Sequence, residues 1–263
     1  KSPAGHTEFS NPIEMVQFLA KLRKLSGGKP VGFKLCVGRK SEFVAICKAM
    51  IDLETYPDFI TVDGSQGGTG AAPLEFANSV GTPLNEGLYF VHNTLRGFGI
   101  RNKIRLIVSG KVFTSFHIMT KLSLGADVVN SARGMMLALG CIQALQCDSN
   151  KCPVGVATTN PELVRGLVVP DKSARVARFH KLTIAAFSEI LGSMGCSEPS
   201  EILPSHIHRR IADGSVKTYA EIYPLVPVGA FLKPGGTNYN IPEDFMNAID
   251  LSSADTFAER SAS

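Results

Sequence analysis

Short apolar segments that alternate with stretches of helical spacing constrain the fold of this chain more than any other feature. Four such segments are present, at residues 31–37, 59–62, 104–108 and 127–130. Apolar residues recur at helical spacing over 13–25, 41–53, 85–98 and 114–124, and a further helical stretch follows Gly134. Because parallel strands need a crossover between them, this alternation predicts parallel βαβ units and an α/β fold.

The number of predicted strands is too small for a closed barrel. A TIM (β/α)8 barrel needs eight strands, whereas the alternation stops near residue 150 after about four. The chain is therefore either a small open sheet or half of a barrel. We expect the barrel half in residues 1–160 and a mostly helical and irregular extension in residues 161–263. Within the extension we expect helices over 172–191, 201–211 and 219–222 and a loosely packed end from Pro224 onward.

The composition excludes several classes of protein. Hydrophobic residues make up 44% and charged residues 19% of the 263 residues, which is typical of a folded domain. The net charge of +4 is scattered and tryptophan is absent, so we expect an anionic small molecule rather than a nucleic acid as the ligand. No apolar run is long enough to insert in a membrane, and the first residues lack the apolar core of a signal peptide, so we expect a cytoplasmic protein.

Three of the six cysteines lie close together, at Cys141, Cys147 and Cys152. An odd number of thiols does not suit a disulfide framework. Zinc sites usually hold their cysteines in close pairs, whereas three thiolates from one loop suit a 3Fe-4S cluster, which needs three ligands. The alternative is three reduced structural cysteines near the end of a helix. The remaining cysteines lie in apolar patterns and are expected in the core, at Cys36, Cys47 and Cys196.

Small and charged residues follow three of the predicted strands. A glycine-rich loop occupies residues 63–70, Ser109–Lys111 follow the next strand, and Ser131–Gly134 follow the last. Ligands of parallel sheets bind beyond the carboxyl ends of the strands, and two consecutive strand ends with small residues and a cation suit a phosphate. Taken alone, the glycine loop is as typical of a plain tight turn as of a ligand site. Lys111 and Arg133 taken alone are as typical of solvated surface charges as of phosphate ligands.

Lys34 interrupts an apolar strand. Burial of an unpaired ammonium is costly, so we expect this side chain to point into the lumen of the barrel or toward a ligand. The region around N1 and C2=O of a flavin, where negative charge develops on reduction, is a suitable partner. The alternative is a lysine on an edge strand.

Four segments together resemble the FMN-binding domain of glutamate synthase. They are Val-Gly-Phe-Lys-Leu at 31–35, Asp-Gly-Ser-Gln-Gly-Gly-Thr-Gly-Ala-Ala-Pro at 63–73, Gly-Ala-Asp at 125–127, and the segment 141–158, whose last cysteine is followed by Pro-Val-Gly-Val-Ala-Thr. The resemblance covers residues 1–210. It implies the C-terminal half of a (β/α)8 barrel that carries FMN, with a 3Fe-4S cluster beside it.

The resemblance also implies roles for individual residues. Lys34 would contact the flavin ring, and the loop that contains Gln66 would lie near the ring and the 2-oxoglutarate, so Lys34 and Gln66 are the expected catalytic residues. The three clustered cysteines would ligate the iron. The expected cofactor-binding residues are Lys34, Gly67, Gly68, Thr69, Ser109, Gly110, Lys111, Ser131, Ala132 and Arg133.

The expected function is that of a glutamate-synthase-like oxidoreductase. FMN would deliver hydride to a 2-iminoglutarate-type intermediate, giving glutamate or an N-substituted glutamate, and the cluster would relay electrons. The expected partners are a 2-oxoglutarate-type substrate, an electron-donor protein or reductase subunit, and the N-terminal half of the barrel, whose four strands have no counterpart here. The alternative is a half-barrel without flavin that acts as an assembly or interaction module, although such a module has no need for Lys34, the glycine loop and three thiols.

Overall fold

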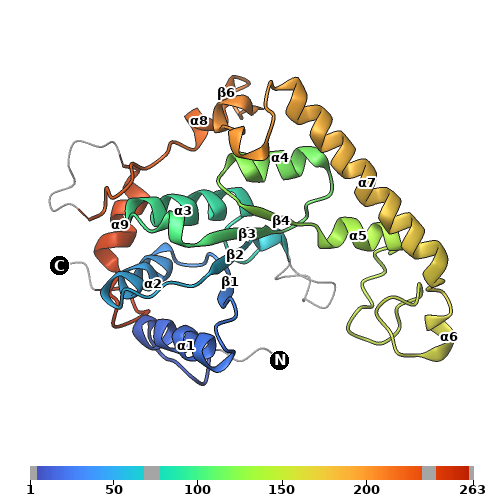
Figure 1. The fold of residues 1–263 in the computed structure, drawn as a ribbon, viewed down its shortest axis with the longest axis horizontal. Helices are drawn as coiled ribbons and strands as arrows, with labels where there is room; N and C mark the ends of the chain where they lie inside the picture. Colours follow the sequence, from blue (N-terminus) through green and yellow to red (C-terminus); the bar gives the residue numbers. More distant parts are fainter. Residues whose placement is uncertain (1–4, 68–77, 233–240, 261–263) are drawn as a thin grey trace.

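A computed structural model describes residues 5–67, 78–232 and 241–260. Its centre is a sheet of four parallel strands in the order β1-β2-β3-β4 (Figure 1). The strands are β1 (Gly32–Cys36), β2 (Phe59–Asp63), β3 (Arg105–Ser109) and β4 (Val128–Asn130). All four strands and their parallel pairing agree with the sequence prediction.

A helix follows each strand, as parallel connections require. The chain enters through α1 (Pro12–Leu25), whose first turn is capped by Asn11, since its Oδ1 accepts the Glu14 N–H at 2.8 Å. The helices that follow the strands are α2 (Lys40–Asp52), α3 (Leu84–Gly97), α4 (Ser115–Ser123) and α5 (Ala132–Leu139). One turn of 3-10 helix precedes α3, at Ser65–Gly67, and another precedes β3, at Arg101–Lys103.

The two faces of the sheet differ in burial. On one face Ile60, Val62 and Leu106 are fully buried in the hydrophobic core. The strand register aligns Lys34 with Thr61, Ile107 and Val128 on the opposite face, where the Val128 side chain remains 48% exposed. Within the described ranges, no strand pairs with the outer edges of β1 and β4. A parallel sheet covered on one face only is what half of a (β/α)8 barrel leaves, so the predicted fold class is confirmed.

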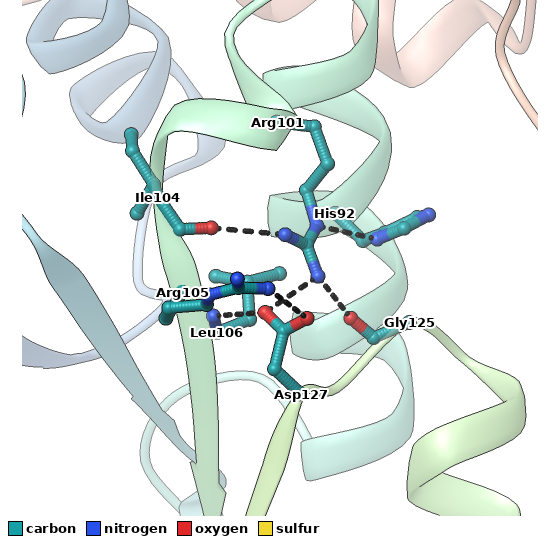
Figure 2. Close-up of polar contacts among 7 residues, drawn as sticks. All are labelled: His92, Arg101, Ile104, Arg105, Leu106, Gly125 and Asp127. Carbon is teal, nitrogen blue, oxygen red and sulfur yellow. Dashed lines mark hydrogen bonds and ion pairs between the residues drawn. The ribbon is translucent and has the colours of Figure 1, made fainter. Parts of the chain in front are cut away.

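An ion-pair network fixes the N-terminal ends of β3 and β4 (Figure 2). Arg101 donates hydrogen bonds to the carbonyls of Ile104 at 2.9 Å and Gly125 at 2.8 Å, and to Oδ2 of Asp127 at 2.9 Å. The same carboxylate oxygen accepts the Leu106 N–H at 2.7 Å. Asp127 therefore ties the start of β4 to β3.

His92 completes this network as an acceptor. Its Nδ1 lies 3.1 Å from Nε of Arg101, which donates to it. Burial, together with the charges of Arg101 and Arg96, lowers the pKa of His92 from 6.5 to about 3. The imidazole is therefore neutral at physiological pH, as a hydrogen-bond acceptor must be.

The substitution Asp127→Asn is expected to lower the free energy of unfolding by about 1–2 kcal/mol, because it removes the charge that Arg101 and the Leu106 N–H face in a half-buried site. The control is Arg105→Gln. Arg105 lies 3.6 Å from the same carboxylate but its side chain is 76% exposed, so its loss should cost less than about 0.5 kcal/mol. Urea denaturation measures both variants, and equal losses would contradict the account.

The C-terminal extension begins with α6 (Pro161–Val164) and the long helix α7 (Val169–Ser193). Helix α7 packs against α4 and α5, and the Ser115 hydroxyl at the start of α4 donates to the Thr183 carbonyl at 2.8 Å. The helix predicted over 172–191 is thus present. The division of the chain at residue 160 stays a prediction.

The helix predicted over 201–211 is wrong. Residues Pro199–Glu201 and Pro204–His206 form short 3-10 turns, because each proline interrupts the ladder of a longer helix. A two-stranded antiparallel sheet follows, made of β5 (His208–Arg210) and β6 (Val216–Thr218). The predicted helix over 219–222 is confirmed as α8 (Tyr219–Ile222).

The expectation of a loosely packed C-terminal end is also wrong for its last part. Helix α9 (Glu243–Leu251) packs on α2, and Phe245 is fully buried with its ring centroid 5.0 Å from that of Phe90. The Lys48 ammonium donates to the carbonyls of Ile249 at 2.7 Å and Ser252 at 2.9 Å.

Among the helices that the structure describes, none combines the length and the apolar character that crossing a membrane requires.

Candidate functional site

The carboxyl ends of the four strands meet at one edge of the sheet. The register places Cys36 beside Asp63, Asp63 beside Ser109, and Ser109 beside Asn130. The segments that follow β2, β3 and β4 therefore start next to one another. Ligands of parallel sheets bind at this edge.

A cavity of about 280 Å³ lies at this edge. It brings together residues from the loop after β2, the loop after β3, the start of α5 and the cysteine segment. Nine of its lining residues were predicted from the sequence, namely Gln66, Gly67, Ser109, Gly110, Lys111, Ala132, Arg133, Cys141 and Cys147. The remaining lining residues are Met136, Gln143, Leu145 and Ala157.

Backbone and side-chain groups make one end of this cavity suitable for an anion. Lys111 and Arg133 bring two positive charges to the wall, and helix α5 begins there at Ala132. Free backbone N–H groups and the dipole of a helix favour negative charge at its first turn. Gly110 and Lys111 both have positive φ, 144° and 47°, and the Lys111 ammonium contacts Oδ1 of Asn78. This geometry is consistent with the predicted phosphate site.

The side-chain amide oxygen of Gln66 already accepts a hydrogen bond from the backbone. Its Oε1 accepts the N–H of Leu84 at 3.2 Å, at the first residue of α3. The carbonyl end of the side chain is therefore held by the backbone, which leaves its NH2 group as the donor for a ligand in the cavity that Gln66 lines.

Gly67 is confined by its neighbours. A Cβ atom on this residue would lie 1.7 Å from Oδ1 of Asp63, so a side chain at position 67 would displace the Asp63 carboxylate. The predicted residues Gly68 and Thr69 lie outside the described residues.

Lys34 lies on β1, an outer strand of the described sheet, on the face opposite the core, and it does not line the cavity. Its ammonium is 2.6 Å from Oδ2 of Asp63, and its side chain is 58% exposed. The Asp63 carboxylate also lies close to Gly67, which lines the cavity, although Asp63 itself does not line it. The ammonium is therefore paired, which the sequence did not predict.

Ser131 differs from the other predicted phosphate residues. Its hydroxyl donates to the Val112 carbonyl at 2.7 Å, and it does not line the cavity. The side chain therefore fixes the loop after β3, whereas the adjacent Ala132 and Arg133 reach the cavity.

The three clustered cysteines have different surroundings. Cys141 is half-buried, and its sulfur accepts the Gln143 N–H at 3.4 Å, whereas Cys147 is exposed. Cys152 is buried, and hydrogen bonds from the backbone, that of Ala157 first, lower the pKa of its thiol. Successive N–H groups that converge on one atom form an anion-binding nest, which suits the thiolate form that ligates metals.

The residue types of this segment suit a thiolate-ligated cluster, but the cysteine side chains are not gathered closely enough to form a metal-binding group. Cys141 and Cys147 share one cavity, and Ala157, five residues after Cys152, lines the same cavity. Across residues 5–67, 78–232 and 241–260, however, no three histidine, cysteine or acidic side chains gather into a group that could hold a metal ion.

The other three cysteines, which were predicted to lie in the core, differ in their burial. Cys47 is fully buried, as expected, and Cys196 is half-buried against the core. Cys36 is exposed, which contradicts the prediction. It lies at the carboxyl end of β1, outside the hydrophobic core, and its sulfur faces the Thr82 carbonyl at 3.8 Å. Met136 was not predicted as a site residue, although it lies three residues after Arg133 and hence on the same face of α5.

Comparisons with known proteins identify a family model and several relatives that this chain resembles. Residues 1–197 match the family model described as a conserved region in glutamate synthase. The glutamate synthase large subunit-like protein YerD of Bacillus subtilis (strain 168) is 42% identical over 215 residues, which are 82% of this chain and 41% of that protein. The archaeal glutamate synthase (NADPH) of Methanocaldococcus jannaschii is 34% identical over 195 residues, 74% of this chain and 38% of that protein.

A third, longer relative matches a similar share of this chain. The ferredoxin-dependent glutamate synthase of Antithamnion sp. is 30% identical over 202 residues, which are 77% of this chain and 13% of that protein. The matched region thus spans about two-fifths of the length of the first two relatives.

Proposed function

This chain belongs to the glutamate synthase family, and from that premise we propose that it is the part of an oxidoreductase that holds FMN and a 3Fe-4S cluster side by side. The whole enzyme would form glutamate, or an N-substituted glutamate, from 2-oxoglutarate and an amine donor. When bound, FMN would supply hydride to the carbon of the imino intermediate, and the cluster would supply electrons from an electron-donor protein or reductase subunit.

One observation carries this proposal. A single cavity is lined both by the strand-end residues proposed to hold FMN and by Cys141 and Cys147 of the proposed cluster segment. A module that only mediates assembly has no reason to gather cations, glycines and thiols around one cavity. The six cysteines are unbridged in the structure, which suits the proposed cytoplasmic location.

The cationic end of the cavity would bind the phosphate of FMN. Lys111 and Arg133 would pair with its charge, and the backbone at Ser109, Gly110 and the start of α5 would donate hydrogen bonds. Ser131 would act indirectly, by fixing the loop through Val112. Binding at this end orients the cofactor but leaves its ring to other residues.

The region around Asp63 would lie at the flavin ring and the oxoacid. The Leu84 N–H holds the Gln66 amide oxygen, so the amide NH2 group is the end of this side chain that would donate to a ligand. Lys34 would bring positive charge toward the ring, and its pairing with Asp63 holds the ammonium in one place. Gly68 and Thr69 complete the proposed cofactor-binding set.

The activity can be tested with the full-length protein, purified without oxygen and reconstituted with FMN and iron. Reduced methyl viologen would supply electrons, and glutamine or ammonium would serve as amine donors. We expect labelled glutamate from labelled 2-oxoglutarate only when the reductant is present. Reconstituted protein that forms no glutamate or N-substituted glutamate with either donor, or with a panel of primary amines, would contradict the proposed reaction.

A further inference from the structure

The side chain of Asn150 joins the two ends of the segment that carries Cys152. Its Oδ1 accepts hydrogen bonds from the backbone N–H of Thr159 at 2.7 Å and from the Thr159 hydroxyl at 3.2 Å. The Thr158 hydroxyl donates to the main-chain carbonyl of Asn150 at 2.7 Å. Residues that are eight and nine positions apart are thereby tied together.

The tie encloses Cys152 and the turn that follows it. Cys152 is buried, and the Gly155 N–H donates to the Cys152 carbonyl at 3.2 Å. The position of the Cys152 sulfur depends on the path of this loop. When its ends are free, a loop of this length samples many conformations, and the sulfur is then no longer held in one place.

The backbone of the loop explains why the residue at this position is asparagine. Asn150 has φ of 62°, in the left-handed region that asparagine, aspartate and glycine adopt most readily. The position also requires a side-chain acceptor for Thr159, which glycine lacks. The middle of the loop is held separately, since a Cβ atom on Gly155 would lie 2.4 Å from the Leu163 carbonyl oxygen of α6.

We propose that Asn150 is a positioning residue for the cluster segment, because it holds the loop of residues 150–159 closed and thereby keeps the sulfur of Cys152 in one place. The proposal rests on the proposed function in so far as Cys152 is taken as a cluster ligand. Asn150 does not line the cavity, so it acts through Cys152 rather than on a cofactor.

Three variants separate this role from a general effect on folding. Asn150→Gly keeps the left-handed backbone and removes the acceptor. Asn150→Asp keeps both. Asn160→Gly is the matched control, because it removes another exposed asparagine nearby, whose Oδ1 accepts the Glu162 N–H at 3.0 Å and caps α6.

Two measurements test the proposal in the full-length protein. The first is hydrogen exchange of the backbone amides 154–157 in iron-free protein, and the second is the half-life of bound iron in air after anaerobic reconstitution. We expect Asn150→Gly to accelerate the exchange and shorten the half-life by about tenfold each, the effect of losing one to two hydrogen bonds. Asn150→Asp and Asn160→Gly should stay within about twofold of the wild type.

The outcomes separate the two proposals. Exchange at 154–157 that is unchanged in Asn150→Gly would overturn the positioning role, whatever the iron content. Wild-type protein that binds no iron would overturn the proposed cluster instead, and the exchange measurement would still decide the role of Asn150.

Discussion

Replacement of any one of Cys141, Cys147 and Cys152 by serine is expected to reduce the iron content of the reconstituted protein from about three atoms per chain to none. A cluster with three protein ligands has none to spare. Cys152 should be the most sensitive, because its buried sulfur lies in the backbone nest and a serine hydroxyl does not become an anion there at neutral pH. Iron analysis and the electron paramagnetic resonance signal of an oxidised 3Fe-4S cluster measure the loss.

The control for these substitutions is Cys196→Ser. Cys196 lies beyond the end of α7, away from the cavity, and its thiol contacts the Glu201 carbonyl at 3.7 Å, which a serine hydroxyl can also do. This variant should bind iron as the wild type does. Full iron content in any of the three ligand variants would show that the cysteine segment is not the cluster site.

The substitution Arg133→Ala is expected to weaken FMN binding by about 1–3 kcal/mol, which is about 5- to 150-fold in Kd. Arg133 lines the cationic end of the cavity at the first turn of α5, and the proposed phosphate contact is charge-assisted. Titration of the apoprotein with FMN, followed by quenching of flavin fluorescence, measures the change.

Arg165→Ala is a matched control for Arg133→Ala. Arg165 is 75% exposed, pairs with Glu162 at 3.2 Å, and lies outside the cavity lining. Its removal changes the net charge by the same amount and should leave the FMN affinity within about twofold. Equal losses of affinity in both variants would mean that Arg133 acts through overall charge and not at a phosphate site.

The sequence predicted the parallel sheet closely because its signals are local and strong. The two central strands carry buried apolar residues, such as Ile60 and Val62 on β2 and Leu106 on β3, and each of the four strands is followed by a helix. Since the carboxyl ends of parallel strands share one edge, the convergence of Ser109, Gly110 and Arg133 on one cavity followed from topology.

The missed elements have weaker or conflicting signals. Strand β5 consists of three exposed polar residues, so it has no apolar periodicity, and the useful signal was the turn-forming pair Asp213–Gly214 before β6. Helix α9 has acidic residues in its first turn and apolar residues at positions 245, 248 and 249, but the many prolines of this region favoured an irregular interpretation.

The geometry of the cysteine segment could not be predicted from sequence spacing. Gln143, Leu145 and Asn150 all have positive φ, which residues such as Gln143 and Leu145 rarely adopt, so tertiary contacts fix the path of the loop. The pairing of Lys34 with Asp63 depends in the same way on the register between β1 and β2.

The most direct test of the central claim, that one cavity holds the flavin beside the cluster, is the cofactor content of the full-length wild-type protein produced with ample iron and purified without oxygen. We expect about one FMN and about three irons per chain, with both flavin and iron–sulfur absorption in the visible spectrum. Colourless protein that takes up neither FMN nor iron on anaerobic reconstitution would contradict it.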